Sequence, residues 1–184
     1  MKRLLDLLLS LIALALLSPL LIAAAVAVKL GSPGPIFFKQ IRVGRHTRTF
    51  GMYKFRTMVA NAASIGPYFT NSGDPRITPA GRWLRKTSVD ELPQLLNVLL
   101  GQMSLVGPRP DVPAQEPLYT PQQWQRRHQV RPGITGLAQA KIRSEGTPEQ
   151  RTALDLQYVA EHSLWLDVRI MWWTLARLGG SGAN

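Results

Sequence analysis

The sequence has 184 residues, of which 45% are hydrophobic, and this suits one domain with a core of its own. Lysine and arginine outnumber aspartate and glutamate by 22 to 11, so the net charge of +11 favours an anionic partner: a phosphorylated substrate, an acidic lipid headgroup or a nucleic acid. Because cysteine is absent, disulfide frameworks and thiolate metal sites are excluded, and three scattered histidines form no zinc motif.

Residues 4–28 are almost entirely apolar and have basic residues on both sides. A signal peptide would have a shorter apolar core followed by a cleavage site, so we expect this segment to be retained. As a straight helix it would be about 37 Å long, which is sufficient for a hydrocarbon core of about 30 Å. The segment is therefore predicted to enter a membrane.

The pair Ser18-Pro19 interrupts the middle of this segment. Proline removes one backbone hydrogen bond and kinks a helix, and the serine hydroxyl could satisfy the carbonyl that is freed. Basic residues at both ends fit two cytoplasmic ends, as in a re-entrant helix-break-helix. These residues alone leave open whether the helix re-enters or spans with a kink.

A β-hairpin is predicted after a turn at residues 31–35, with strands at 36–43 and 47–58 that are rich in β-branched and aromatic residues. Lys54 and Arg56 lie on one side of the second strand, where they could bind phosphate or simply face water. Loops follow, and then a short basic helix over residues 80–86 that contains Arg85.

Two adjacent carboxylates, Asp90 and Glu91, stand at the centre of the sequence. Proline is tolerated only in the first turn of a helix, so Pro93 predicts that the next helix starts near Asp90, with Asp90 as its N-cap. The neighbouring cations should keep both carboxylates ionised, as a nucleophile or a magnesium ligand requires. An ordinary N-cap followed by an acidic residue would have the same sequence.

Three helices and a glycine-rich loop are predicted in the remaining sequence. The helices cover residues 121–129, 148–162 and 164–178, and the basic loop at 131–136 could receive a phosphate. Asp155 could face the site or the solvent. Tryptophan and arginine in the last helix suit a membrane interface, although a docked core helix has a similar composition. Residues 179–184 are expected to be a flexible tail.

Several longer motifs occur in order, and together they carry a family resemblance. They are Tyr-Lys-Phe-Arg-Thr-Met at 53–58, Asp-Pro-Arg-Ile-Thr at 74–78, Asp-Glu-Leu-Pro-Gln-Leu at 90–95, Asn-Val at 97–98, Met-Ser-Leu-Val-Gly-Pro-Arg-Pro at 103–110 and Val-Arg-Pro-Gly-Ile-Thr-Gly at 130–136. Over nearly its full length the chain resembles the bacterial sugar transferase family, the small monotopic phosphoglycosyl transferases that start glycoconjugate assembly.

The resemblance implies that a sugar 1-phosphate moves from a UDP-sugar to a polyprenyl (undecaprenyl) phosphate and that UMP is released. It makes Asp90 the nucleophile that forms a covalent phosphosugar intermediate, and it makes Glu91 a ligand of Mg²⁺. The best candidates for diphosphate-binding cations are Arg85, Arg109 and Arg131. Second-rank candidates for substrate binding are Lys54, Arg56 and Asp155. The resemblance also favours re-entry at Ser18-Pro19.

The expected fold is α+β and mainly α, with a re-entrant membrane helix at 1–30, a catalytic domain with interfacial helices at 31–178, and the tail. The resemblance places this domain on the cytoplasmic face of the bacterial inner membrane, in contact with lipids. No nucleic-acid module is visible, and a homodimer is left open. Gln102, Leu137 and Gln157 depart from residues frequent in the family, so the sugar is not predicted.

Two other functions are compatible with this composition. A membrane phosphohydrolase would let water resolve the aspartyl intermediate. A non-catalytic basic membrane protein would bind acidic lipids or nucleic acid through scattered arginines, but it would not need the Asp90-Glu91 pair beside the Gly107-Pro-Arg-Pro110 turn.

Overall fold

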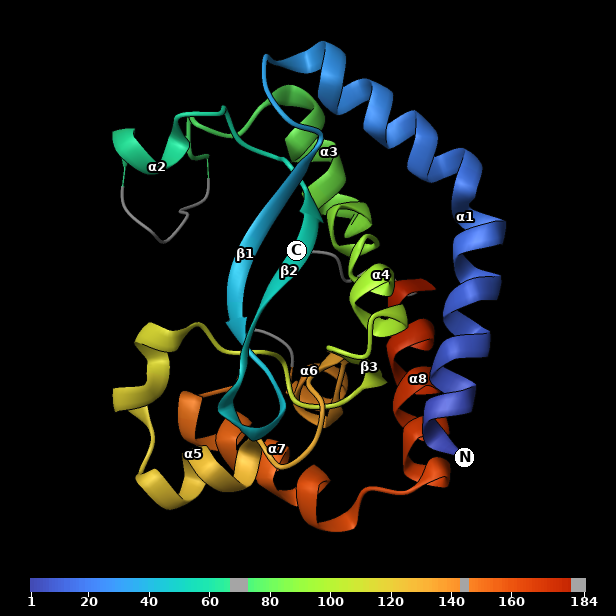
Figure 1. Ribbon diagram of the computed structural model, residues 1–184, viewed down its shortest axis with the longest axis vertical. Coiled ribbons are helices and arrows are strands. Elements are labelled where there is room, and N and C mark those ends of the chain that lie inside the picture. Colours follow the sequence, from blue (N-terminus) through green and yellow to red (C-terminus); the bar gives the residue numbers. More distant parts are fainter. Residues whose placement is uncertain (67–72, 143–145, 180–184) are drawn as a thin grey trace.

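An antiparallel β-hairpin runs through the middle of the molecule, and helices surround it (Figure 1). The computed structural model describes residues 1–66, 73–142 and 146–179. Strands β1 (Phe37–Val43) and β2 (Thr49–Phe55) pair along their whole length, from Phe37 opposite Phe55 to Val43 opposite Thr49. The predicted α+β, mainly helical fold and its hairpin are confirmed, with a second strand shorter than expected.

Helix α1 (Lys2–Gly31) contains Pro19 and changes direction partway along its length (Figure 1). Proline leaves the carbonyl of Ala15 without its usual donor, and the Ser18 hydroxyl donates to that oxygen at 2.8 Å. The expected break between two arms is therefore a bend within one helix, because the serine replaces the missing donor. By length and composition α1 can cross a membrane, and only 11% of its most apolar window is buried in the protein.

The first two turns of α1 are bound to the rest of the chain by charged side chains. Arg3 donates to main-chain carbonyls at the end of helix α4 (Gln94–Leu99), with distances of 2.6 and 3.1 Å. The buried carboxylate of Asp6 accepts from the hydroxyl of Ser104 at 2.9 Å and from the amide of Leu105 at 3.1 Å. Arg3 and Asp6 thus attach the N-terminal end of this apolar helix.

The other end of α1 is bound by Arg56. Its guanidinium donates to the carbonyls of Ser32 at 2.7 Å and Val28 at 3.2 Å, and it also donates to Pro33. Both ends of the helix therefore contact the same domain, while the middle projects away from it (Figure 1). Lys and Arg donors satisfy carbonyls that the last turn of a helix leaves without partners.

The remaining helices are short. They are α2 (Ala62–Ile65), α3 (Pro79–Thr87), α4, α5 (Pro121–Arg127), α6 (Leu137–Ile142), α7 (Pro148–Glu161) and α8 (Leu164–Gly179). Helices α3, α5 and α7 share a start signal, since a threonine side chain caps each of them and proline follows. The helices predicted at 80–86, 121–129, 148–162 and 164–178 are confirmed, whereas α6 was not predicted. The predicted tail lies, after Gly179, outside the described residues.

A second strand pair, β3 (Ser104–Val106) and β4 (Gly133–Thr135), is parallel and was not predicted. It corrects the interpretation of the glycine-rich segment as a phosphate-binding loop. A Cβ on Gly133 would lie 2.1 Å from the amide nitrogen of Gly107, so both glycines permit close contact between two backbones. The amide of Gly107 donates to Thr135 at 2.9 Å, and that of Gly133 donates to Pro108 at 2.9 Å.

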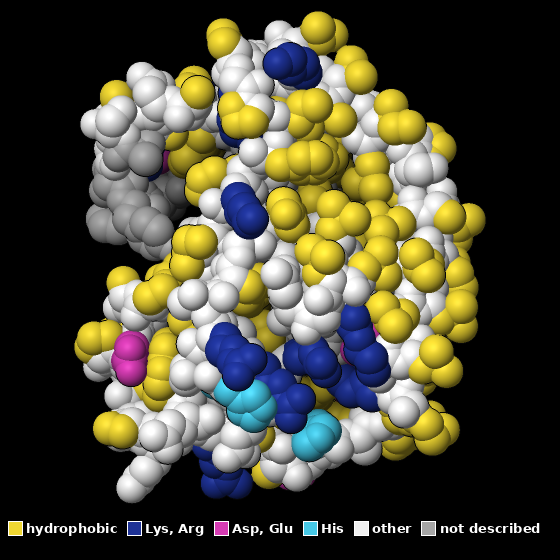
Figure 2. Space-filling view, viewed as in Figure 1, with side chains coloured by type: hydrophobic (Ala, Val, Ile, Leu, Met, Phe, Trp, Pro, Cys, Tyr) yellow, Lys and Arg dark blue, Asp and Glu magenta, His cyan; other side chains and the backbone are white. Residues whose placement is uncertain are grey.

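Apolar side chains are exposed along α1 and on parts of α3, α4 and α8. Figure 2 shows hydrophobic side chains over the right-hand side of this face, where α1 runs, and over its upper part. In α8, Ile170 is fully buried, whereas Trp165 and Trp172 are 70% and 69% exposed. Helix α8 therefore packs on the core with one side and presents tryptophans on the other, as an interfacial helix would.

Candidate active site

The two central carboxylates lie on a short turn between α3 and α4. Ser88 is left-handed, with φ of 57°, and it reverses the chain into a 3₁₀ turn over Val89–Glu91. Helix α4 begins only at Gln94, with Pro93 at its N-cap, so the prediction that Asp90 caps this helix is wrong. The cause is local. The backbone amides of residues 91 and 92 donate to the carbonyls of residues 88 and 89, three positions earlier, and this makes a tighter turn than an α-helix.

Glu91 is held by two cations. Its carboxylate accepts from Lys54 Nζ at 2.8 Å and from Arg109 at 2.6 Å. Burial acts to raise the pKa of Glu91, but the charges and hydrogen bonds of Arg109 and Lys54 outweigh it and lower the pKa to about 2. Glu91 is therefore ionised at any pH at which the protein is expected to work.

Asp90 has the opposite electrostatic environment. In the described part of the chain it forms no ion pair, and burial together with the neighbouring negative charge of Glu91 raises its pKa to about 6. Lys54 and Arg85 act against this rise. Asp90 is thus mostly ionised at neutral pH and has a carboxylate that no cation neutralises directly, which is the state that a nucleophile needs.

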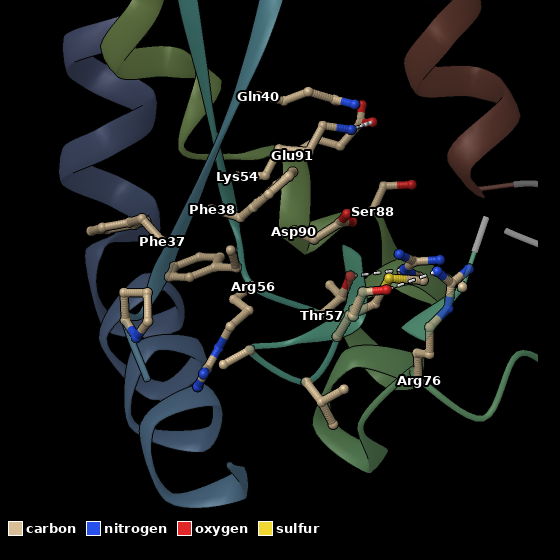
Figure 3. A pocket seen from close by; sticks show the side chains of 18 residues that line it. Phe37, Phe38, Gln40, Lys54, Arg56, Thr57, Arg76, Ser88, Asp90 and Glu91 are labelled. Atoms are coloured by element: carbon tan, nitrogen blue, oxygen red, sulfur yellow. Dashed lines mark hydrogen bonds and ion pairs between the residues drawn. The ribbon is translucent and has the colours of Figure 1, made fainter. Parts of the chain in front are cut away.

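A cavity of about 680 Å³ adjoins both carboxylates and lies along β1, β2 and the end of α3 (Figure 3). Lys54 and Arg85 line it, and Arg85 is oriented by a hydrogen bond from its Nε to the Thr57 hydroxyl at 2.9 Å. Figure 3 shows Lys54 beside Glu91, while Arg56 points away from Asp90. Arg56 lines the cavity but is used to hold α1, as described above.

Asn97 fixes the distance between α4 and β2. Its amide nitrogen donates to the carbonyl of Gly51 at 2.8 Å, and its amide oxygen accepts from the backbone of Tyr53 at 2.9 Å. Because Asn97 is fully buried, these bonds are protected from water. They hold the strand that carries Lys54 against the segment that carries Glu91.

A second cavity of about 660 Å³ lies on the other side of Glu91. Ser88 and Glu91 line both cavities, and Arg109 lines the second. Most of the other lining residues are apolar and come from the turn before α4 and from α4, β3, β4, α6 and α8: Leu92, Leu95, Leu105, Ile134, Ala140, Met171 and Leu175. The Glu91 carboxylate therefore stands between a polar and an apolar cavity.

Ser88 and Gln139 are among the polar lining residues of these cavities that were not predicted from the sequence. Ser88 has no signal except its place just before the carboxylates. Gln139 lines the apolar cavity, and neither its amide nitrogen nor its amide oxygen has a hydrogen-bond partner among the described residues. Its position depends on helix α6, which the sequence did not predict.

Five of the predicted site residues lie together. The other three, Arg56, Arg131 and Asp155, do not have the expected place, and Arg56 has been described above. Asp90, Glu91, Lys54, Arg85 and Arg109 form the cluster described above. Arg131 lines a different cavity and donates from Nε to the carbonyl of Gly101 at 2.8 Å. Asp155 is buried and accepts twice from Arg127, at 2.8 and 3.0 Å, so it faces neither the carboxylates nor the solvent.

Among residues 1–66, 73–142 and 146–179, no three histidine, cysteine, aspartate or glutamate side chains gather to hold a metal. Mg²⁺ does not require such a group, since it commonly takes one or two carboxylates and completes its shell with water and substrate phosphates. Asp90 and Glu91 fit that pattern, because they are adjacent and line the polar cavity.

Known proteins resemble this chain over nearly all of its length. The family model described as bacterial sugar transferase matches residues 1–180. A relative from Caulobacter vibrioides, named UDP-glucose:undecaprenyl-phosphate glucose-1-phosphate transferase, is 44% identical over 96% of this chain and 69% of its own length. An exopolysaccharide production protein from Rhizobium leguminosarum is 44% identical, over 95% of this chain and 93% of its own.

Other relatives are longer. The chain covers 45% of an Aeromonas hydrophila protein that is 43% identical and named UDP-N-acetylgalactosamine-undecaprenyl-phosphate N-acetylgalactosaminephosphotransferase. It covers 35% of an undecaprenyl-phosphate glucose phosphotransferase from Komagataeibacter xylinus. Their names differ in the sugar and agree in the lipid acceptor. By the match to the family model and by identity over most of the chain, this protein belongs to the bacterial sugar transferase family.

Proposed function

We propose that this protein transfers a sugar 1-phosphate from a UDP-sugar to a polyprenyl phosphate, releases UMP, and so starts assembly of a bacterial glycan. The observation that carries the proposal is the Asp90 carboxylate at the polar cavity, which has no ion pair among the described residues and lies beside a Glu91 that is paired with two cations. The names of relatives that share more than 40% of residues with this chain supply the donor and acceptor classes.

In the first step, a carboxylate oxygen of Asp90 attacks the β-phosphorus of the UDP-sugar. A bond forms between that oxygen and phosphorus, the bond from phosphorus to the bridging oxygen breaks, and UMP leaves with the electron pair. Lys54 and Arg85 line the cavity in which the diphosphate would lie, so they would bind its negative oxygens and orient it.

In the second step, a phosphate oxygen of the lipid attacks the same phosphorus, and the bond to Asp90 breaks. The products are a polyprenyl diphosphosugar and a free carboxylate. The apolar cavity is our candidate for the beginning of the lipid chain, because it lies between α4 and α8, whose exposed sides are apolar, and it has Arg109 at the edge near Glu91.

Mg²⁺ is proposed as the cofactor, held by Glu91 with Asp90 beside it. A magnesium ion would neutralise part of the charge of the donor diphosphate and of the departing UMP. Glu91 is suited to this role because its low pKa keeps it ionised. Lys54 and Arg109 hold its carboxylate in a fixed orientation towards the boundary of the two cavities.

We also propose that α1 re-enters the membrane instead of spanning it, with the domain on the cytoplasmic face of the inner membrane. The attachment of both helix ends to one domain supports this, since a helix that crosses the membrane would separate them. A single cysteine added directly before Met1 and another at Leu30, at the two exposed ends of α1, should be labelled from the same side by an impermeant maleimide. Labelling of the two positions from opposite sides would contradict re-entry.

The reaction is tested by monitoring UMP release from a panel of UDP-sugars with Mg²⁺, in the presence and absence of undecaprenyl phosphate. A transferase releases UMP catalytically only when the lipid is present, and without it at most one equivalent per enzyme. Sustained release without lipid would instead support the phosphohydrolase, and no release with any donor would support the non-catalytic membrane protein.

A further inference from the structure

A third cavity, of about 410 Å³, lies away from both carboxylates, at the start of α1. It is lined by the start of α1, the hairpin turn, the segment before β4 and the end of α7. Its charged lining residues are Lys2, Arg3, Asp6, Arg45 and Arg131, and we call it the basic cavity. Figure 2 shows Lys and Arg side chains gathered on the lower part of the same face, towards the start of α1.

The single carboxylate of this lining does not balance its cations. Asp6 is buried and accepts hydrogen bonds from Ser104 and Leu105. Lys2 pairs at 2.6 Å with Asp167, which is not part of the lining. Asp6 is therefore the one carboxylate in a lining that also contains three arginines, and its charge offsets only part of theirs.

Arg45 and Arg131 each have hydrogen-bond donors that no described residue uses. Each uses only Nε, which donates to the carbonyl of Gln129 at 2.9 Å and of Gly101 at 2.8 Å, respectively. Within the described residues their terminal nitrogens have no partner. Burial, together with the charges of Arg3 and Arg45, lowers the pKa of Arg131, which means that the fold holds like charges close together. An anion between them would relieve that repulsion.

The position of the cavity indicates where such an anion would come from. Leu4 and Leu8, on the turns of α1 beside Lys2 and Arg3, are 70% and 52% exposed, and Trp165 at the start of α8 is 70% exposed. Apolar side chains that would face acyl chains thus begin within one or two helical turns of the cations. This is the level at which a bilayer places its phosphate groups.

We propose that the basic cavity binds the phosphate of an anionic phospholipid headgroup, with Arg45 and Arg131 as its donors and the acyl chains along the exposed leucines of α1. The site is separate from the polar and apolar cavities. It would attach the start of the membrane helix to the lipid surface, and it does not depend on which substrates the carboxylates process.

The test is native mass spectrometry of the full-length chain in neutral detergent, titrated with phosphatidylglycerol or with phosphatidylcholine. We expect phosphatidylglycerol to bind the wild type more tightly than phosphatidylcholine. In the double variant Arg45→Gln/Arg131→Gln its affinity should fall about thirtyfold, since each basic residue near an anionic lipid contributes about a factor of five. The matched control Arg48→Gln/Arg126→Gln removes two exposed charges outside the cavity and should bind like wild type.

Arg45→Glu provides a second variant, because Arg45 is exposed and its replacement cannot disrupt the core. Its affinity for phosphatidylglycerol should also fall. Equal retention of phosphatidylglycerol in the wild type, in both double variants and in Arg45→Glu would overturn the proposal. Inorganic phosphate forms a further arm: if it displaces the lipid at equal concentration, the site recognises free phosphate and the lipid assignment is wrong.

Discussion

Two clusters of acidic and basic side chains in this protein have similar compositions and different environments. The open cluster consists of Lys54, Arg85, Asp90, Glu91 and Arg109 and borders two cavities. The closed cluster consists of Asp111, Arg127, His128 and Asp155, each no more than 5% exposed. In the closed cluster Arg127 binds both carboxylates. In the open cluster Glu91 is paired twice, and Asp90 has no ion pair within the described part of the chain.

The difference in ion pairing separates a cluster that stabilises the fold from one that is available for a reaction. Burial lowers the pKa of His128 to about 4, so this histidine stays neutral, and Arg127 is committed to its two partners. The Asp90 carboxylate, by contrast, forms no ion pair with any residue that the structure describes. The two clusters are also connected, since Arg127 donates to the main-chain carbonyl of Arg109 at 2.8 Å. The closed cluster thus holds the backbone of Arg109, a residue of the open cluster.

The largest effect is expected for Asp90→Asn. Loss of the nucleophile should reduce turnover at least about 10⁴-fold and abolish covalent phosphosugar labelling. The same change should stabilise the fold. The pKa of Asp90 in the folded protein is about 6, which lies above the ordinary 3.8, so ionised Asp90 destabilises the fold at neutral pH. This destabilisation decreases as the pH falls from about 6 towards 3.8. After allowance for partial exposure, we expect Tm to rise by roughly 3–6 °C at pH 7.5.

Both readouts come from one preparation, by UMP assay and scanning fluorimetry. Retained turnover in Asp90→Asn would reject Asp90 as the nucleophile. A lower Tm would instead show that Asp90, like the closed cluster, has a structural role.

Arg127→Met should have the opposite effect on stability. It leaves Asp111 and Asp155 buried without their cation, which costs about 4 kcal/mol and lowers Tm by roughly 10 °C. Arg126→Met, on the same helix but exposed, is the matched control and should change Tm by less than about 2 °C. Equal Tm values for the two variants would remove the distinction between the closed and the open cluster.

Glu91→Gln should reduce kcat about a hundredfold, because a charged ligand is lost and Lys54 and Arg109 lose their partner. It should also lower the pKa of Asp90, since the negative charge of Glu91 contributes to raising it. Activity titrated against Mg²⁺ should require a higher concentration than in the wild type. An unchanged Mg²⁺ dependence would contradict the assignment of Glu91 as a ligand.

The smallest effect concerns pH in the wild type. Because only ionised Asp90 can attack, kcat/KM should be constant above pH 6 and fall about tenfold per unit below the pKa of about 6. In Glu91→Gln the inflection should move to lower pH. If the wild type and Glu91→Gln have their inflection at the same pH, a group other than Asp90 controls the fall of kcat/KM at acid pH.

The sequence by itself determined the hairpin, four of the helices and the apolar α1, and it singled out Asp90 and Glu91 as candidates. These features have local causes: alternation in strands, threonine-proline caps and a continuous apolar run. Lys54, Arg85 and Arg109 were also chosen correctly as neighbours, since family motifs contain Lys54 and Arg109, and Arg85 belongs to the basic helix just before the two carboxylates.

Tertiary structure alone decided the rest. The parallel pair β3 and β4 joins segments about thirty residues apart, and strands of three residues have no readable period. That pairing directs Arg131 to the start of α1 and away from Asp90, and the packing of α7 on α5 buries Asp155 against Arg127. Local sequence specifies which side chains are charged. Which of them become paired and which remain free depends on contacts between distant segments, and in this protein that difference distinguishes Asp90 from Asp155.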